Sequence, residues 1–302
     1  MRLLKNIGRR AGYWMLRGFL ALMPILPLGL VRWVGRRVGD LIRVASRRRR
    51  HIADHNLRIA FGNELSDAQR SAIQRECFRQ FGMLIFESMK LAFVSDSEFT
   101  RLIHMDAESE RMARSALDEG RGVIFVSAHF GNFEMAARWL AVHGYEVLVV
   151  MRAARDAATT ELMTEMRKRN GMTAIRRDLA GRPMLAALRR GGCVAILADQ
   201  NADDVVVPFF GRPTGTVDGP ARLALHTGAP IVVGMCARDA TGGFTVTVEG
   251  VVRADASADR DAELRRIAAE TNRLMEVAIR RHPEQWLWFH NRWRSSPGGG
   301  AP

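Results

Sequence analysis

Two hydrophobic periodicities divide the chain near residue 120. Before that point apolar residues recur at intervals of three and four, and Ser66-Asp67 marks the start of a long helix. Beyond it, short apolar runs alternate with amphipathic segments. The runs predict strands at 122–126, 146–151, 193–198, 230–236 and 244–249, and the segments predict helices at 133–142, 157–170, 182–190 and 219–227. This alternation predicts an α/β fold, with a mostly parallel central sheet flanked by helices.

Two further patterns complete the predicted architecture. Thr241-Gly242-Gly243 predicts a tight turn between the last two strands, which we expect to form an antiparallel edge of the sheet. Residues 259–281 predict a long amphipathic helix, and His282-Pro283 ends it. Residues 295–302 are rich in glycine and proline, so we expect this tail to be disordered.

The N-terminal region predicts contact with a membrane. Residues 18–31 carry no charge, but fourteen residues are fewer than the roughly 20 that a spanning helix needs. No signal-peptidase site follows, and the arginine block at 47–50 matches segments that bind anionic lipid, or is only a solvated helix face. We therefore predict an uncleaved anchor over residues 1–45, inserted or lying in the interface. The alternative is a buried hairpin kinked at Pro24 and Pro27.

Composition narrows the choice of partners. The net charge is +13, almost all of it from arginine, so we expect a polyanion: nucleic acid, an anionic membrane surface or a phosphorylated substrate. A genome bias toward arginine is the plainer alternative. Hydrophobic residues make up 47% of the 302 residues, which is enough for a full core. Cys77, Cys193 and Cys236 have neither zinc-site nor disulfide spacing and suit a core in a reducing compartment.

The candidate chemistry lies at the end of the first predicted strand. His129 follows that strand, Gly131-Asn132 breaks the chain, and Glu134 falls in the first turn of the next helix, with Asn132 suited to the N-cap. Residues five apart on a continuous helix point away from each other, so the pair can meet only across such a break. We expect Glu134 to accept the Nδ1 proton of His129 and leave Nε2 as a base. Because chance supplies this spacing about once per chain, structural roles for both residues are an equal alternative.

No nucleophile accompanies this pair. The chain has no G-x-S-x-G motif and no cysteine close to His129 in sequence, so the pair suits activation of a substrate hydroxyl for attack on an acyl carbonyl.

Charged and polar residues also end the later predicted strands. These are Arg152, the adjacent Arg176 and Arg177, and Asp199 with Gln200. The carboxyl ends of parallel strands form the rim where ligands bind, and a guanidinium suits a phosphate group. For each arginine taken alone, a solvent-facing charge is the simpler explanation.

Five ordered blocks resemble a known family. They are H-F-G-N-F-E at 129–134, D-Q at 199–200, V-P-F-F-G at 207–211, T-G-A-P-I-V-V at 227–233 and H-P-E-Q-W-L-W-F-H-N-R-W at 282–293. Together they resemble the late acyltransferases of lipid A biosynthesis, the lauroyl/myristoyl transferases of the lysophospholipid acyltransferase superfamily. The resemblance extends from R-R-H-I-A-D-H-N-L at 49–57 to Arg294. It implies a glycerolphosphate acyltransferase-like α/β domain over residues 46–294, with a helical lead-in to about residue 118.

The resemblance also implies residue roles and partners. His129 is implied as general base and Glu134 as its partner, while Arg152, Arg176 or Arg177, and Asp199 are implied to line the acceptor site. The implied donor is an acyl-carrier-protein thioester, and the implied acceptor is a phosphorylated glucosamine disaccharide at the cytoplasmic face of the inner membrane. The implied reaction needs no metal or organic cofactor and no nucleic acid.

Three other functions remain open at this point. The same fold suits acylation of a different membrane glycolipid or phospholipid, such as a mannosylated phosphatidylinositol. Water in place of the acceptor would make the protein an acyl thioesterase. A basic protein that only binds membranes or nucleic acid would account for the arginine block, but not for the polar residues at the strand ends.

Overall fold

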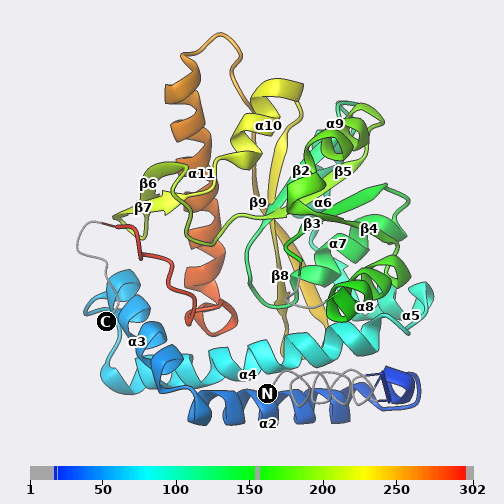
Figure 1. Ribbon diagram of the computed structural model, residues 1–302, viewed down its shortest axis with the longest axis vertical. Helices are drawn as coiled ribbons and strands as arrows, with labels where there is room; N and C mark the ends of the chain where they lie inside the picture. The colour runs from blue at the N-terminus through cyan, green and yellow to red at the C-terminus, as the bar shows by residue number, and fades with distance from the viewer. Residues whose placement is uncertain (1–16, 19, 154–156, 297–302) are drawn as a thin grey trace, which may run out of the picture.

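A mixed, mostly parallel sheet forms the middle layer of the protein. The computed structural model describes residues 17–18, 20–153 and 157–296, and within them a seven-stranded sheet has the order β1-β9-β8-β2-β5-β3-β4 (Figure 1). The parallel strands are β2 (Val123–Ser127), β3 (Val147–Met151), β4 (Met172–Arg176), β5 (Cys193–Leu197) and β8 (Ile231–Arg238). β9 (Phe244–Val252) runs antiparallel to β8, and β1 (Ile103–Met105) runs parallel to β9. The predicted α/β fold with a mostly parallel sheet is confirmed.

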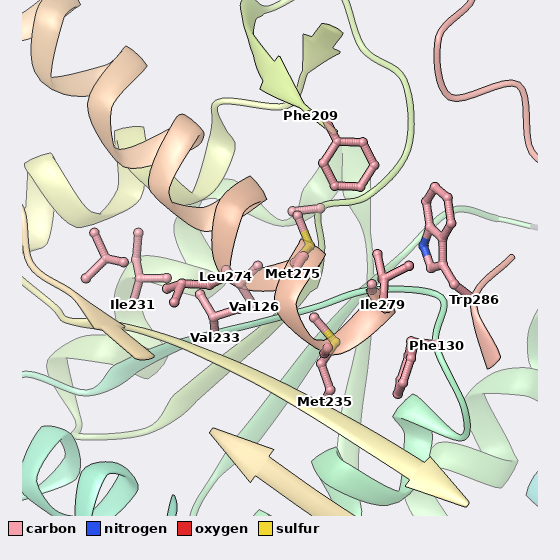
Figure 2. Packing of buried hydrophobic residues seen from close by; sticks show 14 of the residues in the cluster. Val126, Phe130, Phe209, Ile231, Val233, Met235, Leu274, Met275, Ile279 and Trp286 are labelled. Atoms are coloured by element: carbon pink, nitrogen blue, oxygen red, sulfur yellow. The ribbon is translucent and has the colours of Figure 1, made fainter. Parts of the chain in front are cut away.

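Helices cover both faces of the sheet. One face carries α9 (Gly181–Arg189), α10 (Gly219–Thr227) and α11 (Arg260–Arg281), and the other carries α6 (Ala107–Leu117), α7 (Phe133–Val142) and α8 (Ala157–Arg169). All residues of β2 are buried, as expected for a central parallel strand between two helical layers. Figure 2 shows Val126 and Val233 of the sheet beside Leu274, Met275 and Ile279 of α11, within the larger hydrophobic core.

The helices that precede the sheet are α2 (Leu28–Ala45), α3 (Arg47–Phe61), α4 (Asp67–Leu91) and α5 (Asp96–Leu102). Ser66 caps α4 in a capping box with Gln69, which confirms the predicted helix start. α4 crosses the carboxyl end of the parallel strands, where Glu87 contacts Arg238 at the end of β8, and α2 lies along α4 (Figure 1).

The predicted membrane anchor over residues 1–45 is not supported. Within the described ranges 17–18, 20–153 and 157–296, no helix is both long and apolar enough to cross a membrane. Residues 1–16 and 19 lie outside the described part. The chain turns at residues 23–26 and continues as α2, and Leu20, Met23 and Val31 are buried. The alternative of a buried hairpin kinked at Pro24 and Pro27 does not match either, because Leu22, Ile25 and Leu30 are exposed.

Some elements differ from the sequence predictions. β1 pairs outside β9, so the β8–β9 pair is antiparallel as predicted but does not form the sheet edge. The sequence predicted no strand over the V-P-F-F-G block, which lies mostly in β6 (Val205–Phe209) and forms a separate two-stranded hairpin with β7 (Arg212–Thr216). In the predicted tail, Ser295 bonds Asn201, while residues 297–302 lie outside the described part.

Candidate active site

The register of two neighbouring strands brings His129 and Asp199 together. β2 and β5 pair in parallel with Ser127 opposite Leu197, so the two residues each lie two positions beyond the paired strand ends. His129 Nδ1 is 2.8 Å from Asp199 Oδ1, and the backbone N–H of His129 donates to Oδ2 at 2.9 Å. The His129 side chain is 24% exposed and that of Asp199 is 3% exposed. Asp199 therefore holds the imidazole at Nδ1 and leaves Nε2 on the other side of the ring.

The environment of Asp199 keeps its carboxylate ionised. Burial alone would raise the pKa of Asp199, but the His129 imidazole and hydrogen bonds from His129 and Trp286 lower it to about 2. The Trp286 Nε1–H donates to Oδ2 at 2.8 Å. An ionised carboxylate at Nδ1 favours the tautomer with its proton on that nitrogen, which leaves the lone pair on Nε2.

The pKa of His129 reflects two opposing effects. Burial lowers it, but the attraction and hydrogen bond of Asp199, with a further contribution from the Glu134 carboxylate, raise it above its usual value. A raised pKa makes Nε2 a stronger base.

Backbone contacts fix the turn that carries His129. The Gly131 N–H donates to the Gln285 carbonyl at 2.9 Å, and the Leu287 N–H donates to the His129 carbonyl at 3.1 Å. Phe130 and Trp286 form an antiparallel bridge between the same two segments. Gly131 has φ +52°, and a Cβ at this position would collide with the Cys236 carbonyl oxygen, so the turn requires glycine.

The expected partnership of His129 with Glu134 differs from the structure. Glu134 lies in the first turn of α7 as predicted, but its carboxylate pairs with Arg167 of α8, Oε1 to Nη2 at 2.5 Å and Oε2 to Nε at 3.2 Å. Both side chains are largely buried, so the arginine requires this charged partner. Asn132 occupies the N-cap position without capping α7 through its side chain, and its Nδ2–H donates to Glu87 at 3.1 Å.

An apolar cavity of about 310 Å³ lies beside the site. Residues of α4, α7 and α8 form its walls, including Leu84, Ile85, Met89, Phe133, Leu162 and Met166, together with the Glu134–Arg167 pair. Leu84 also lines the small space next to His129, and the Phe133 ring centroid is 5.4 Å from that of the imidazole. The cavity therefore begins next to the histidine, and its lining suits a hydrocarbon chain.

The predicted rim residues lie at one edge of the sheet. Gln200 is near the base, with its Nε2 3.4 Å from His129 Nε2. Arg152 follows β3, Arg176 ends β4 and Arg177 comes next, and all three are exposed. These arginines end or follow β3 and β4, which lie on the opposite side of β5 from β2, the strand that precedes His129. The structure thus brings His129, Asp199 and Gln200 together and places the three arginines farther along the same edge.

One cysteine lies beside the base in space. Cys77 of α4 lines the small space that also contains His129, and its Sγ–H donates to the Trp286 carbonyl at 3.0 Å. Burial raises the pKa of Cys77 to about 12, so this thiol stays protonated and is a poor nucleophile. Cys77, Cys193 and Cys236 are all buried and unpaired, as predicted for core residues.

Three residues that contribute to the site were not identified from the sequence. Trp286 belongs to a segment expected only to pack in the core, yet it also holds Asp199. Arg292 is fully buried and donates to the carbonyls of Gln200 and Gly215. Arg167 gives no signal beyond its charge. A buried arginine beside tryptophans is the feature that distinguishes Arg292, because aromatic runs rarely enclose a cation without a structural use for it.

Comparisons with known proteins match one family over most of the chain. Residues 4–295 match the protein family described as Bacterial lipid A biosynthesis acyltransferase. The chain is 27% identical over 292 residues to the Lipid A biosynthesis palmitoleoyltransferase of Escherichia coli (strain K12), covering 95% of this chain and 92% of that protein. It is 28% identical over 294 residues to the Lipid A biosynthesis lauroyltransferase of the same organism, with the same coverage. It is also 28% identical over 231 residues to the Phosphatidylinositol mannoside acyltransferase of Mycobacterium tuberculosis (strain ATCC 25618 / H37Rv), covering 72% of this chain and 66% of that protein.

Proposed function

Because the chain belongs to the bacterial lipid A biosynthesis acyltransferase family, we propose that it transfers a fatty acyl chain from an acyl-carrier-protein thioester to a hydroxyl of a lipid A precursor. The reaction takes place at the cytoplasmic face of the inner membrane. The observation that carries the proposal is the 2.8 Å contact between His129 Nδ1 and the buried Asp199 carboxylate, next to an apolar cavity. This arrangement is suited to a base that acts on a substrate hydroxyl.

His129 takes the proton in the proposed reaction. The acceptor hydroxyl gives its proton to Nε2 while its oxygen attacks the thioester carbonyl carbon. The carbon–sulfur bond then breaks, the thiolate leaves with the carrier protein, and Nε2 returns the proton to that sulfur. The products are an ester on the acceptor and a free thiol on the carrier. Asp199 remains ionised throughout and stabilises the imidazolium that forms.

The cavity accommodates the acyl chain in this proposal. Its volume of about 310 Å³ is at the lower end of the roughly 300–1,000 Å³ of small-molecule sites, and apolar side chains make up most of its wall. Each methylene that leaves water for such a lining contributes about 0.8 kcal/mol, so the depth of the cavity selects chain length. The Glu134–Arg167 pair ties α7 to α8 and thereby fixes two walls of the cavity.

The exposed arginines contact the acceptor phosphate. Arg176 pairs with Asp178 at 2.7 Å, but both side chains are more than half exposed, so this pair contributes little and a phosphate can replace the carboxylate. Arg152 and Arg177 lie at the same edge of the sheet. The Gln200 side-chain amide is 3.4 Å from His129 Nε2 on that side, and it positions the acceptor hydroxyl.

A purified assay tests this function. The protein is combined with acyl-carrier-protein donors of graded length and a phosphorylated glucosamine disaccharide lipid, and products are identified by mass spectrometry. The proposal requires the acceptor to gain the mass of one acyl group. Transfer only to a mannosylated phosphatidylinositol would instead support the function named for the mycobacterial relative. Free fatty acid released at the full rate without any acceptor would indicate a thioesterase.

A further inference from the structure

The apolar cavity beside the candidate site includes a buried amide with an unpaired oxygen. Asn170, the residue after α8, lines the cavity and is 4% exposed. Its Oδ1 has no hydrogen-bond partner in the described part of the chain. A buried polar atom without a partner is costly and uncommon in proteins. In the wall of a ligand cavity, it points to a ligand group that supplies the missing hydrogen bond.

Backbone contacts hold Asn170 in place. Its N–H donates to the carbonyls of Met166 and Arg167, at 3.2 and 3.0 Å, in the last turn of α8. The Arg167 guanidinium is bonded in turn to the Glu134 carboxylate of α7. The amide is therefore placed by α8 and its contact with α7, and its side-chain oxygen takes no part in holding it.

Other polar groups in the cavity wall already have partners. Both oxygens of Glu134 bond Arg167, and the Ser88 Oγ–H donates to Asn132 Oδ1 at 3.4 Å. Most of the remaining wall is hydrocarbon, from Leu20, Leu84, Ile85, Met89, Phe133, Leu162, Met163 and Met166. A water molecule in this cavity would need two to four polar partners, and a mostly apolar wall supplies few of them. The unpaired oxygen therefore suits a hydroxyl that a hydrocarbon chain carries into the cavity.

The position of Asn170 along α7 indicates where on the chain that hydroxyl lies. Phe133, at the start of α7, is next to the His129 imidazole. Gly171, which follows Asn170, packs near the other end of the same helix, since a Cβ at Gly171 would lie 3.0 Å from the Ala141 side chain. Phe133 and Ala141 are eight residues apart, which is about 12 Å along the helix. A chain that meets Asn170 has thus extended well beyond the reacting carbonyl at His129.

We propose that the cavity selects acyl chains that carry a hydroxyl group remote from the thioester, and that this hydroxyl donates to Asn170 Oδ1. The inference rests on the proposed function, because it takes the chain in the cavity to be that of the acyl donor. Asn170 is then a specificity-determining residue. It binds the tail of the donor and takes no part in proton transfer at His129, and no bond forms or breaks at the hydroxyl.

A hydrogen bond at this place discriminates more strongly than an apolar wall does. A site built to bond a substrate hydroxyl rejects the analogue without it, because the buried protein group is then left unpaired. An apolar pocket distinguishes similar chains only weakly. Replacing Asn170 by leucine, which has a similar size, converts the first kind of site into the second.

Binding of free fatty acids tests the proposal without any acyl transfer. Displacement of parinaric acid, a fluorescent fatty acid, from the full chain compares dodecanoic acid with isomers hydroxylated near the carboxyl group, in mid-chain or near the methyl end. We expect a mid-chain or methyl-end isomer to bind the wild type at least about tenfold more tightly than dodecanoic acid. Asn170→Leu should lose this preference. The matched control, Asn291→Leu, removes another unpaired buried amide oxygen that is not in the cavity wall, and it should keep the preference.

Four results would overturn the inference. The wild type binds no hydroxylated isomer more tightly than dodecanoic acid, it prefers only the isomer hydroxylated next to the carboxyl group, the preference survives in Asn170→Leu, or the control loses it equally. The first two comparisons need no variant. Thermal unfolding of Asn170→Leu should have a midpoint no lower than that of the wild type, because leucine leaves no polar atom unpaired.

Acyl transfer from carrier-protein donors with the same chains separates this inference from the proposed function. Faster transfer of the hydroxylated chain by the wild type, but not by Asn170→Leu, would support both. A hydroxyl preference in binding without transfer from any donor would reject the proposed function and leave the selectivity of the cavity intact. Full transfer with no hydroxyl preference would reject the inference alone.

Discussion

Replacing Asp199 by asparagine tests which of two carboxylates, Asp199 or Glu134, orients His129. The asparagine side chain has the same shape, and its oxygen can still accept from Trp286 Nε1 and the backbone N–H of His129, because both donate to Oδ2 of Asp199 at present. Its amide nitrogen then takes the place of Oδ1, 2.8 Å from Nδ1. An NH₂ group donates and cannot accept, so Nδ1 must give up its proton and Nε2 must carry it. In the neutral histidine, Nε2 then carries a proton and cannot accept one from the substrate hydroxyl.

The expected loss of activity follows from the change of His129 to the tautomer with its proton on Nε2. In serine proteases the equivalent change lowers kcat by about 10⁴-fold while leaving the geometry intact. Asp199 is 3% exposed, so water has little access to replace its oxygen. We expect kcat/KM for acyl transfer to fall about 10³- to 10⁴-fold, which corresponds to about 4–5.5 kcal/mol of lost transition-state stabilisation.

The matched variant is Glu134→Gln. Its amide oxygen can keep one hydrogen bond to Arg167, and only the weaker, longer-range attraction to His129 is lost. We expect kcat/KM to fall by less than about tenfold, with some loss of stability because Arg167 is buried. Initial rates are compared with both substrates present, and thermal unfolding verifies that each variant is folded. If Glu134→Gln loses about 10³-fold while Asp199→Asn stays within about tenfold, Glu134 is the orienting carboxylate and the reasoning from the structure is wrong.

Other predictions follow from the same contacts. Since the pKa of His129 is raised and the base must be neutral, kcat/KM should rise with pH through a pKa above 6.5, and that limb should move to lower pH in Asp199→Asn; an unmoved limb would contradict the assignment. Glu87→Gln removes the carboxylate shared by the buried Arg238 and the partly buried Arg32, so urea denaturation should show about 3–5 kcal/mol less stability, and a loss below about 1 kcal/mol would count against the charged network. Met166→Trp should shift preference toward shorter acyl donors in a competition assay, whereas an unchanged chain-length profile would argue against the cavity.

Two of the strands that the sequence predicted lie between helical layers on both faces of the sheet. β2 and β5 lie in the middle of the sheet, and their nearly continuous apolar runs reflect helices above and below them. β4 was missed because it is an edge strand, and most of Met172–Arg176 is only partly buried or exposed. The β6–β7 hairpin was missed because Pro208 interrupts its apolar run, which is tolerated in an isolated two-stranded ribbon.

The candidate site was only partly predictable, because it depends on which strands are neighbours in the fold. His129 follows from its position at a strand end, but the five-residue spacing directed attention to Glu134, whose real partner is Arg167, 33 residues away. Asp199 was identified as a rim residue and not as the partner of His129, from which it is separated by 70 residues. Residues of β2 and β5 pair with the same offset of 70, from Val123 with Cys193 onward, so the pairing of the two strands determines the dyad. Nothing in a single sequence states which strands are neighbours.

The central claim is that His129 is the base in acyl transfer, and the rate of His129→Ala tests it most directly. The control is His104→Ala, because that side chain is 63% exposed and its strand β1 is separated from β2 by β9 and β8. kcat/KM is measured with an acyl-carrier-protein donor and the phosphorylated acceptor, on protein whose unfolding midpoint matches the wild type. We expect His129→Ala to lose at least about 10³-fold and His104→Ala to keep wild-type turnover. Near-normal transfer by folded His129→Ala would contradict the account.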